Sequence, residues 1–143
     1  MHVHRASLEV ATSGGGQVID ITSQVAAEVT RSSILEGLAT VFVPGATAAV
    51  TTIEYEDGLV ADFARTWEEL VPEGRRYAHN VRWGDGNGHS HVRASMLGPS
   101  LSVPVEKGAL ILGTWQQIIL VDFDNRPRSR RYVCQVMGLR GGE

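Results

Sequence analysis

The sequence predicts an α+β fold, an antiparallel sandwich-like sheet with two main helices packed on it. Strand-forming runs outnumber helical ones, and short turns join most of them, as in antiparallel sheets. The predicted order β-β-α-β-β-α-β-β-β-β does not alternate strand with helix, which argues against a doubly wound parallel sheet. A chain of 143 residues fits a single domain, 1–143, and no stretch resembles a linker that would divide it.

The predicted strands are rich in β-branched and apolar residues, and turn-forming residues bound several of them. A glycine-rich turn at 13–16 separates the first two strands, and a Pro-Gly pair at 44–45 follows the third. The predicted strands are residues 3–11, 17–19, 38–43, 48–55, 100–105, 109–112, 114–123 and 130–137.

Two stretches carry apolar residues at the spacing of one helix face. The first helix is predicted to begin at Thr22 or Ser23 and to run to about residue 35, before Gly37 stops it. The second is predicted to open at Asp57 and to be ended by Pro72. Its predicted core-facing residues are Leu59, Phe63, Trp67 and Leu70.

The charge balance and the cysteine count limit the partners and the compartment. Sixteen acidic and thirteen basic residues give a net charge of -3, and no basic stripe precedes the C-terminal third, so no nucleic-acid partner is expected. The single cysteine, Cys134, excludes an internal disulfide, and its apolar surroundings indicate a core residue rather than a nucleophile. No apolar run reaches the ~18 residues of a membrane span, so we expect a cytoplasmic protein with no membrane partner.

Three of the five histidines, His79, His89 and His91, fall within thirteen positions. The run GDGNG at 84–88 lies between them, and its three glycines allow tight turns and close approach to a ligand. No helix of useful length is predicted after this loop. If residues 89–91 are extended, His89 and His91 project from the same face, with His79 returning from the other side as a third metal ligand. The alternative is a solvated surface loop that happens to carry histidines.

Five other residues are candidates for a site, although the sequence has no Walker loop, dinucleotide-binding glycine motif, nucleophile elbow or C-x-x-C pair. Glu54 interrupts a strand-forming run, where it could be a general base, a metal ligand or an outward-facing residue. Trp115 is expected in the core rather than as a stacking platform, and with Gln116 it is a candidate for substrate binding. Arg130 and Arg131 could hold a phosphate or carboxylate through guanidinium forks, or belong to a solvated loop.

A series of short motifs runs in order along nearly the whole chain, from about residue 4 to 138. The motifs are Val41-Phe42-Val43-Pro44, Thr47-Ala48-Ala49, Glu54, Val71-Pro72, His79-Asn80, His91, Ser95-Met96-Leu97-Gly98, Gly113-Thr114-Trp115-Gln116 and Ser129-Arg130-Arg131. This series resembles the YjbQ-like family, small bacterial and archaeal proteins catalogued as uncharacterised.

The resemblance implies a sandwich-like α+β fold, a homotrimer and a site that gathers histidines from three segments. His79 and His91 match two of these histidines, and Gly45 stands where the family usually has the third. His89 could supply the imidazole nitrogen that is missing at Gly45, but His89 lies on a different segment of the chain from Gly45. The implied cofactor is a divalent metal, zinc or magnesium. Some members of the family are described as secondary thiamine-phosphate synthases, which join a pyrimidine diphosphate to a thiazole phosphate, so the implied ligand is small and phosphorylated.

Two functions are compatible with these residues. In the first, an enzyme holds a metal or anion between His79, His91 and Glu54, and one of the two arginines binds substrate phosphate. A thiamine-phosphate synthase-like transferase is the implied example, because departing pyrophosphate needs charge neutralisation. In the second, a non-catalytic protein binds a small anionic ligand or a metal in the same pocket. Gly45 favours the second, since the loss of a ligand weakens metal catalysis more than anion binding.

Overall fold

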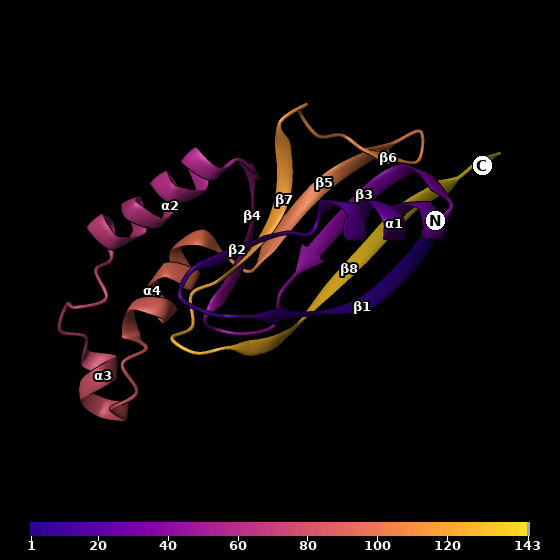
Figure 1. Cartoon of the computed structure of the whole chain (residues 1–143). Helices are drawn as coiled ribbons and strands as arrows, with labels where there is room; N and C mark the ends of the chain where they lie inside the picture. Colours follow the sequence, from indigo (N-terminus) through magenta and orange to yellow (C-terminus); the bar gives the residue numbers. More distant parts are fainter. Residues whose placement is uncertain (143) are drawn as a thin grey trace.

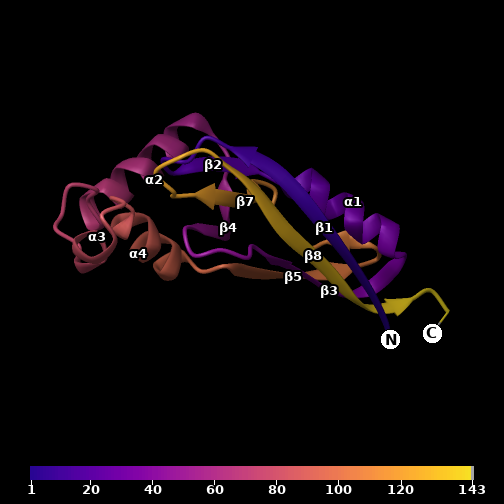
Figure 2. The same cartoon turned by 90° about the horizontal axis from the view of Figure 1, so that it is seen from below.

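The computed structural model describes residues 1–142 and stacks two antiparallel sheets, with helices against the smaller one (Figure 1, Figure 2). The five-stranded sheet has the order β1-β8-β3-β5-β6, and the three-stranded sheet has the order β2-β7-β4. The strands are β1 (His2–Thr12), β2 (Gln17–Asp20), β3 (Ile34–Phe42), β4 (Ala48–Glu54), β5 (Ser100–Glu106), β6 (Ala109–Leu110), β7 (Gln116–Asp122) and β8 (Arg128–Arg140). The helices are α1 (Thr22–Ser32), α2 (Asp57–Leu70), α3 (Ala78–Trp83) and α4 (Gly88–Leu97).

Alternating side chains along the strands fill the space between the two sheets. Val41 of β3 and Cys134 of β8 are paired across the larger sheet, and both are fully buried with Leu120 of β7. Both faces of β7 are covered, which explains why its apolar run at 118–121 is continuous rather than alternating. Cys134 is fully buried in the core, and burial raises the pKa of its thiol to about 11, which disfavours the reactive thiolate.

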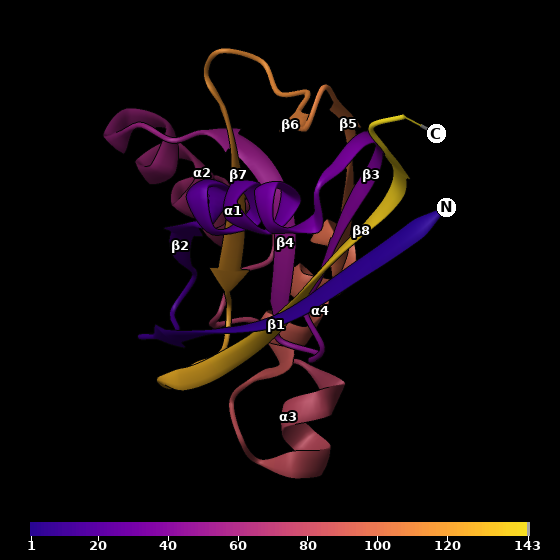
Figure 3. The same cartoon turned by 90° about the vertical axis from the view of Figure 1, so that its right-hand side faces the viewer.

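Helices α2 and α4 cover the outer face of the three-stranded sheet. Phe63 and Trp67 of α2 pack against this face, and the Trp67 ring meets Phe123 edge-on with ring centroids 5.2 Å apart. Helix α1 instead inserts Val25 and Val29 into the core between the sheets. Figure 3 shows α3 projecting beyond the ends of the strands. This arrangement places α3, α4 and the loop between them at one end of the sandwich.

The predicted antiparallel α+β fold is confirmed, but two helices were not expected. Residues 88–97, which the sequence suggests are loop and extended chain, form α4. The buried face of α4 carries His89, Ser90 and Arg93, so polar side chains occupy positions where an apolar stripe would have revealed the helix. Helix α3 has only six residues, too few to show a periodic pattern.

Three smaller expectations also need correction. Helix α1 ends at Ser32 rather than near residue 35, because Ser33 adopts a left-handed φ of 58° and turns the chain into β3. Leu70, expected in the core, is the last residue of α2 and is 58 % exposed. Trp115, also expected in the core, lies in the turn before β7 and is 73 % exposed. Among the residues described, no helix combines the length and apolar character needed to cross a membrane.

Candidate metal centre

The glycine-rich loop folds α4 back against α3. Gly84 ends α3 in the left-handed region at φ 65°, and its N–H donates to the Asn80 carbonyl. A Cβ at Gly88 would lie 2.6 Å from the Cβ of Tyr77, so α4 can begin this close to Tyr77 only with glycine. The side-chain oxygen of Asn80 accepts a hydrogen bond of 2.8 Å from the N–H of Gly88. The first turn of α3 therefore lies beside the first turns of α4.

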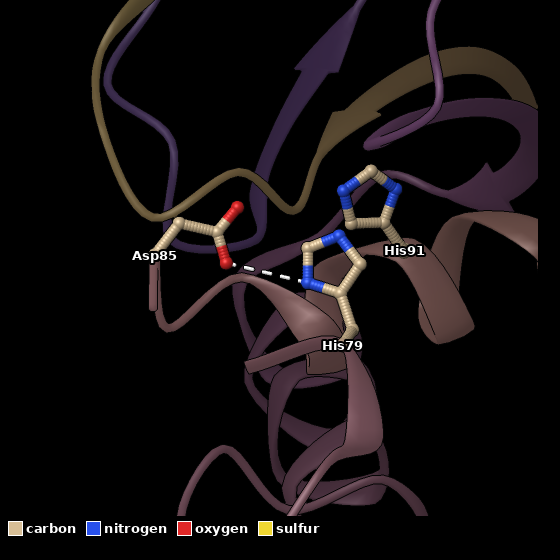
Figure 4. Close-up of side chains that lie close together, drawn as sticks. All are labelled: His79, Asp85 and His91. Atoms are coloured by element: carbon tan, nitrogen blue, oxygen red, sulfur yellow. Dashed lines mark ion pairs between the residues drawn. The ribbon is translucent and has the colours of Figure 1, made fainter. Parts of the chain in front are cut away.

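His79, Asp85 and His91 meet where the chain folds back (Figure 4). The centroids of the two imidazole rings are 4.4 Å apart, and His79 Nδ1 is 3.3 Å from Asp85 Oδ1. One candidate ligand atom from each residue lies within 4.8 Å of the others. The side chains of His79 and Asp85 are 29 % and 45 % exposed, so the cluster lies close to the surface of the molecule.

The donor set of this cluster fits a divalent metal ion, and zinc in particular. His79 Nδ1 is buried and makes no well-aligned hydrogen bond, which leaves this nitrogen available. Zinc binds imidazole and carboxylate at ~2.0–2.2 Å, so tetrahedral donors lie roughly 3.5 Å apart, and small side-chain movements would close the spacing. Magnesium prefers an all-oxygen octahedral shell, which two imidazoles do not provide. Three protein ligands leave a fourth position for water or a ligand.

His89 lies outside this cluster, because residues 89–91 are helical and not extended. Two positions along a helix correspond to a rotation of about 200°, so His89 and His91 point away from each other. His89 is 3 % exposed and its ring lies 6.5 Å from that of Tyr77. Burial lowers the pKa of His89, which favours its neutral form. The structure therefore does not place His89 where it could replace the imidazole absent at Gly45.

Gly45 lies beside the candidate metal centre. With His91 and Ser95 it lines a pocket of about 170 Å³. Its φ of 148° is one that residues with side chains rarely adopt, and a Cβ here would lie 3.1 Å from Nη1 of Arg130. The backbone at this position is shaped for glycine, and Asp85 is the third candidate ligand in this chain.

The two arginines expected to bind substrate face opposite sides of β8. Arg130 donates from Nε and Nη2 to the two carboxylate oxygens of Asp122, at 2.7 and 2.8 Å, and from Nη2 to Thr47 Oγ1. Burial opposes ionisation of Asp122, but hydrogen bonds from Arg130 and Thr12 outweigh it and lower the pKa of Asp122. Arg131 is exposed on the other face. The structure thus commits Arg130 to a structural ion pair and does not bring Arg131 to the histidines.

Glu54, Trp115 and Gln116 line a separate open pocket of about 410 Å³. Glu54 ends β4, whereas Ala48, at the start of the same strand, lines the small pocket beside the histidines. Six steps along an extended strand place the two ends of β4 about 20 Å apart. Within the described part of one chain, Glu54 and the two histidines therefore do not share a site.

Sequence reasoning did not identify Asp85 as a candidate ligand. The signal was a carboxylate six positions after His79 and six before His91. In the sequence this aspartate looks like a turn former, because aspartate is common beside glycine in turns. Only the packing of α3 against α4 gives Asp85 its place next to an imidazole.

Comparison with known proteins agrees with this structure. Residues 6–139 match the family described as "UPF0047 protein YjbQ-like". A UPF0047 protein of Archaeoglobus fulgidus is 40 % identical over 130 residues, which cover 91 % of this chain and 98 % of that protein. A crystal structure of a YbjQ-like protein of unknown function from Sulfolobus solfataricus has 33 % identity and a TM-score of 0.87, covering 96 % and 100 % of the two chains. A hypothetical protein from Aeropyrum pernix K1 has 34 % identity and a TM-score of 0.88, covering 95 % and 99 %. The chain therefore belongs to the YjbQ-like family UPF0047, as its motifs predicted.

Proposed function

We propose that this protein binds a divalent metal ion, preferably zinc, through His79, Asp85 and His91, and that the ion helps to bind a small phosphorylated ligand. The observation that carries the proposal is the convergence of two imidazoles and one carboxylate within 4.8 Å. The cluster lies close to the surface of the molecule, and an ion with three protein ligands keeps a position open. A phosphate oxygen is a suitable occupant of that position.

Binding rather than catalysis is the function that the geometry favours. Glu54, one of whose possible roles was that of a general base, lies at the far end of β4 from the histidines. General-base catalysis requires the base within hydrogen-bond reach of the proton that it removes. Metal-dependent ligand binding has no such requirement.

Calorimetric titration of the metal-free protein with zinc chloride tests the proposed centre. We expect one zinc ion per chain. Asp85→Asn is expected to weaken zinc binding at least about tenfold, because a neutral amide replaces an anionic ligand. Asp57→Asn, at an exposed carboxylate in the first turn of α2, is the matched control and is expected to bind zinc like the wild type. Absence of zinc binding, or equal affinity of the wild type and Asp85→Asn, would reject the centre.

A transferase of the thiamine-phosphate synthase type is the second candidate function. The metal cluster supports this function in one respect. A metal ion held by His79, Asp85 and His91 would neutralise negative charge on the departing pyrophosphate. Metal-loaded protein would be incubated with the pyrimidine diphosphate and the thiazole phosphate, and thiamine phosphate would be measured by chromatography. Product that His91→Ala does not form would support the transferase. If the wild type forms no more thiamine phosphate than His91→Ala does, ligand binding would remain as the function.

A further inference from the structure

A second polar pocket adjoins the metal centre at Asp85. It has a volume of about 340 Å³ and is lined by Asp85, Asn87, Asn125, Arg126 and Arg128. Two connections build it, the loop before α4 and the loop between β7 and β8. Asn125 Nδ2 donates to the Asp85 carbonyl at 2.7 Å, and the Asn125 N–H donates to Asn87 Oδ1 at 3.2 Å. These hydrogen bonds hold the two loops together. Asp85 belongs to both sites, because it lines this pocket and is one of the three candidate metal ligands.

Both guanidinium groups of this pocket have unused donors. Arg126 is exposed, and its backbone N–H donates to Asp124 Oδ1. Among residues 1–142, its guanidinium group has no hydrogen-bond partner. Arg128 donates from Nη2 to Asp124 Oδ2 at 3.1 Å, but its Nε is buried without an acceptor among the described residues. A buried N–H without an acceptor is unfavourable, and a small shift of the Arg128 side chain toward an anionic oxygen in the pocket would satisfy it.

We propose that this pocket is an anion subsite in which Arg126 and Arg128 bind the terminal phosphate of a small organic ligand. The inference rests on the proposed function and deepens it, because it names the place of the ligand's phosphate. Guanidinium groups match phosphate oxygens in planar, paired hydrogen bonds. Asp85 alone would repel a phosphate, and a metal ion bound to Asp85 would offset that repulsion. Phosphate binding is therefore expected to be tighter in the zinc-loaded protein.

The subsite differs from the arginine pair that the sequence suggested. Arg130 already donates to Asp122 and Thr47. Arg131 is exposed on the face of β8 opposite to Arg130, and it does not line the pocket. Arg131 is therefore the matched control, an exposed arginine close in sequence and outside the subsite.

Calorimetric titration of the zinc-loaded protein with phenyl phosphate, a simple phosphomonoester, tests the subsite. Arg126→Ala is expected to weaken phenyl phosphate binding at least about tenfold, because it removes charged hydrogen bonds. Arg126→Lys is expected to fall between Arg126→Ala and the wild type, because it keeps the charge and loses the planar fork. Arg131→Ala is expected to bind like the wild type. The exposed side chain of Arg126 makes these variants compatible with folding, which thermal unfolding would verify.

Three results would overturn the subsite: equal binding by Arg126→Ala and the wild type, equal weakening by Arg126→Ala and Arg131→Ala, or a wild-type Kd above roughly 10 mM. Zinc affinity without phosphate separates this test from that of the proposed function, since Arg126→Ala is expected to bind zinc like the wild type. A protein that binds no zinc but still binds phenyl phosphate through Arg126 would reject the metal centre and support the subsite.

Discussion

At the scale of single residues, the two histidines of α4 have opposite surroundings although one position separates them. His91 lies with its ring 4.4 Å from that of His79, whereas His89 is 3 % exposed and packs near Tyr77. Helical geometry alone causes this difference, because it points the two side chains to different sides of α4. The two histidines are therefore expected to differ in function as well.

Replacing each histidine in turn separates metal binding from stability. His91→Ala is expected to weaken zinc binding by more than the roughly 10–100-fold that loss of an outer-shell partner costs, because it removes a direct ligand. His89→Ala is expected to keep the zinc affinity of the wild type and to lower the free energy of unfolding by about 1–3 kcal/mol. Calorimetry and urea denaturation measure the two effects. Loss of zinc binding in a folded His89→Ala protein would contradict the assignment.

The buried His89 also predicts a pH dependence of stability. Burial lowers the pKa of His89 below its ordinary value of 6.5, and the Arg93 guanidinium lowers it further against the opposing effect of Glu73. Between 6.5 and the folded pKa, the unfolded chain binds the proton more readily, so stability falls as pH falls through this window. His89→Gln removes the titrating group and is expected to flatten the slope. Urea denaturation at several pH values below neutrality would check this, and an unchanged slope would contradict it.

At the scale of elements, one buried ion pair joins the end of β7 to β8. Asp122 is fully buried, and the side chain of Arg130 is 11 % exposed. Asp122→Asn is expected to lower the free energy of unfolding by about 3 kcal/mol, because the charge of Arg130 would keep only the longer ion pair with Asp124, at 3.7 Å. Urea denaturation near neutral pH measures this loss. A loss below about 1 kcal/mol would mean that the pair is effectively solvated.

The same pair predicts how acid destabilises the protein. Burial opposes ionisation of Asp122, but its hydrogen bonds hold the pKa below the ordinary value of 3.8. The stabilisation is therefore present above 3.8 and is lost as pH falls through the folded pKa. The difference in stability between the wild type and Asp122→Asn is expected to narrow in acid, as urea denaturation below pH 4 would show. A difference that stays constant into acid would contradict this account of Asp122.

The strands could be predicted from the sequence more fully than the helical end of the molecule. The run at 48–55 corresponds closely to β4, and the run at 38–43 covers the second half of β3, because β-branched residues bounded by turns have a local signal. Helix α4 has no such signal, since its buried face is mostly polar. The partnership of His79 and Asp85, and the separation of Glu54 from both, depend on contacts between elements that local sequence does not encode.

At the scale of the whole molecule, one row of exposed apolar side chains crosses the outer face of the five-stranded sheet. Val3, Met137 and Leu38 are paired across the neighbouring strands β1, β8 and β3, and they are 57 %, 41 % and 43 % exposed. Phe42, further along β3, is also 43 % exposed. Exposed apolar side chains gathered on one face of a sheet are typical of a protein–protein interface.

We expect this surface to form the contact of a homotrimer, the assembly that the family resemblance implies. Leu38→Lys combined with Met137→Lys would place charges in the contact and is expected to produce folded monomers. Multi-angle light scattering during gel filtration measures the mass of the wild type and the variant. Asp57→Asn, at an exposed position of α2 away from the five-stranded sheet, serves as the control that keeps the wild-type mass. A wild-type protein that is monomeric at micromolar concentration would contradict the proposed assembly.

We propose above all that His79, Asp85 and His91 form one metal centre. The most direct test is a crystal structure of zinc-soaked protein with data collected on both sides of the zinc absorption edge. The account predicts an anomalous peak ~2.0–2.2 Å from a nitrogen of each histidine and an oxygen of Asp85, with a further position open to water or phosphate. A peak elsewhere, or no peak at this cluster at saturating zinc, would contradict it.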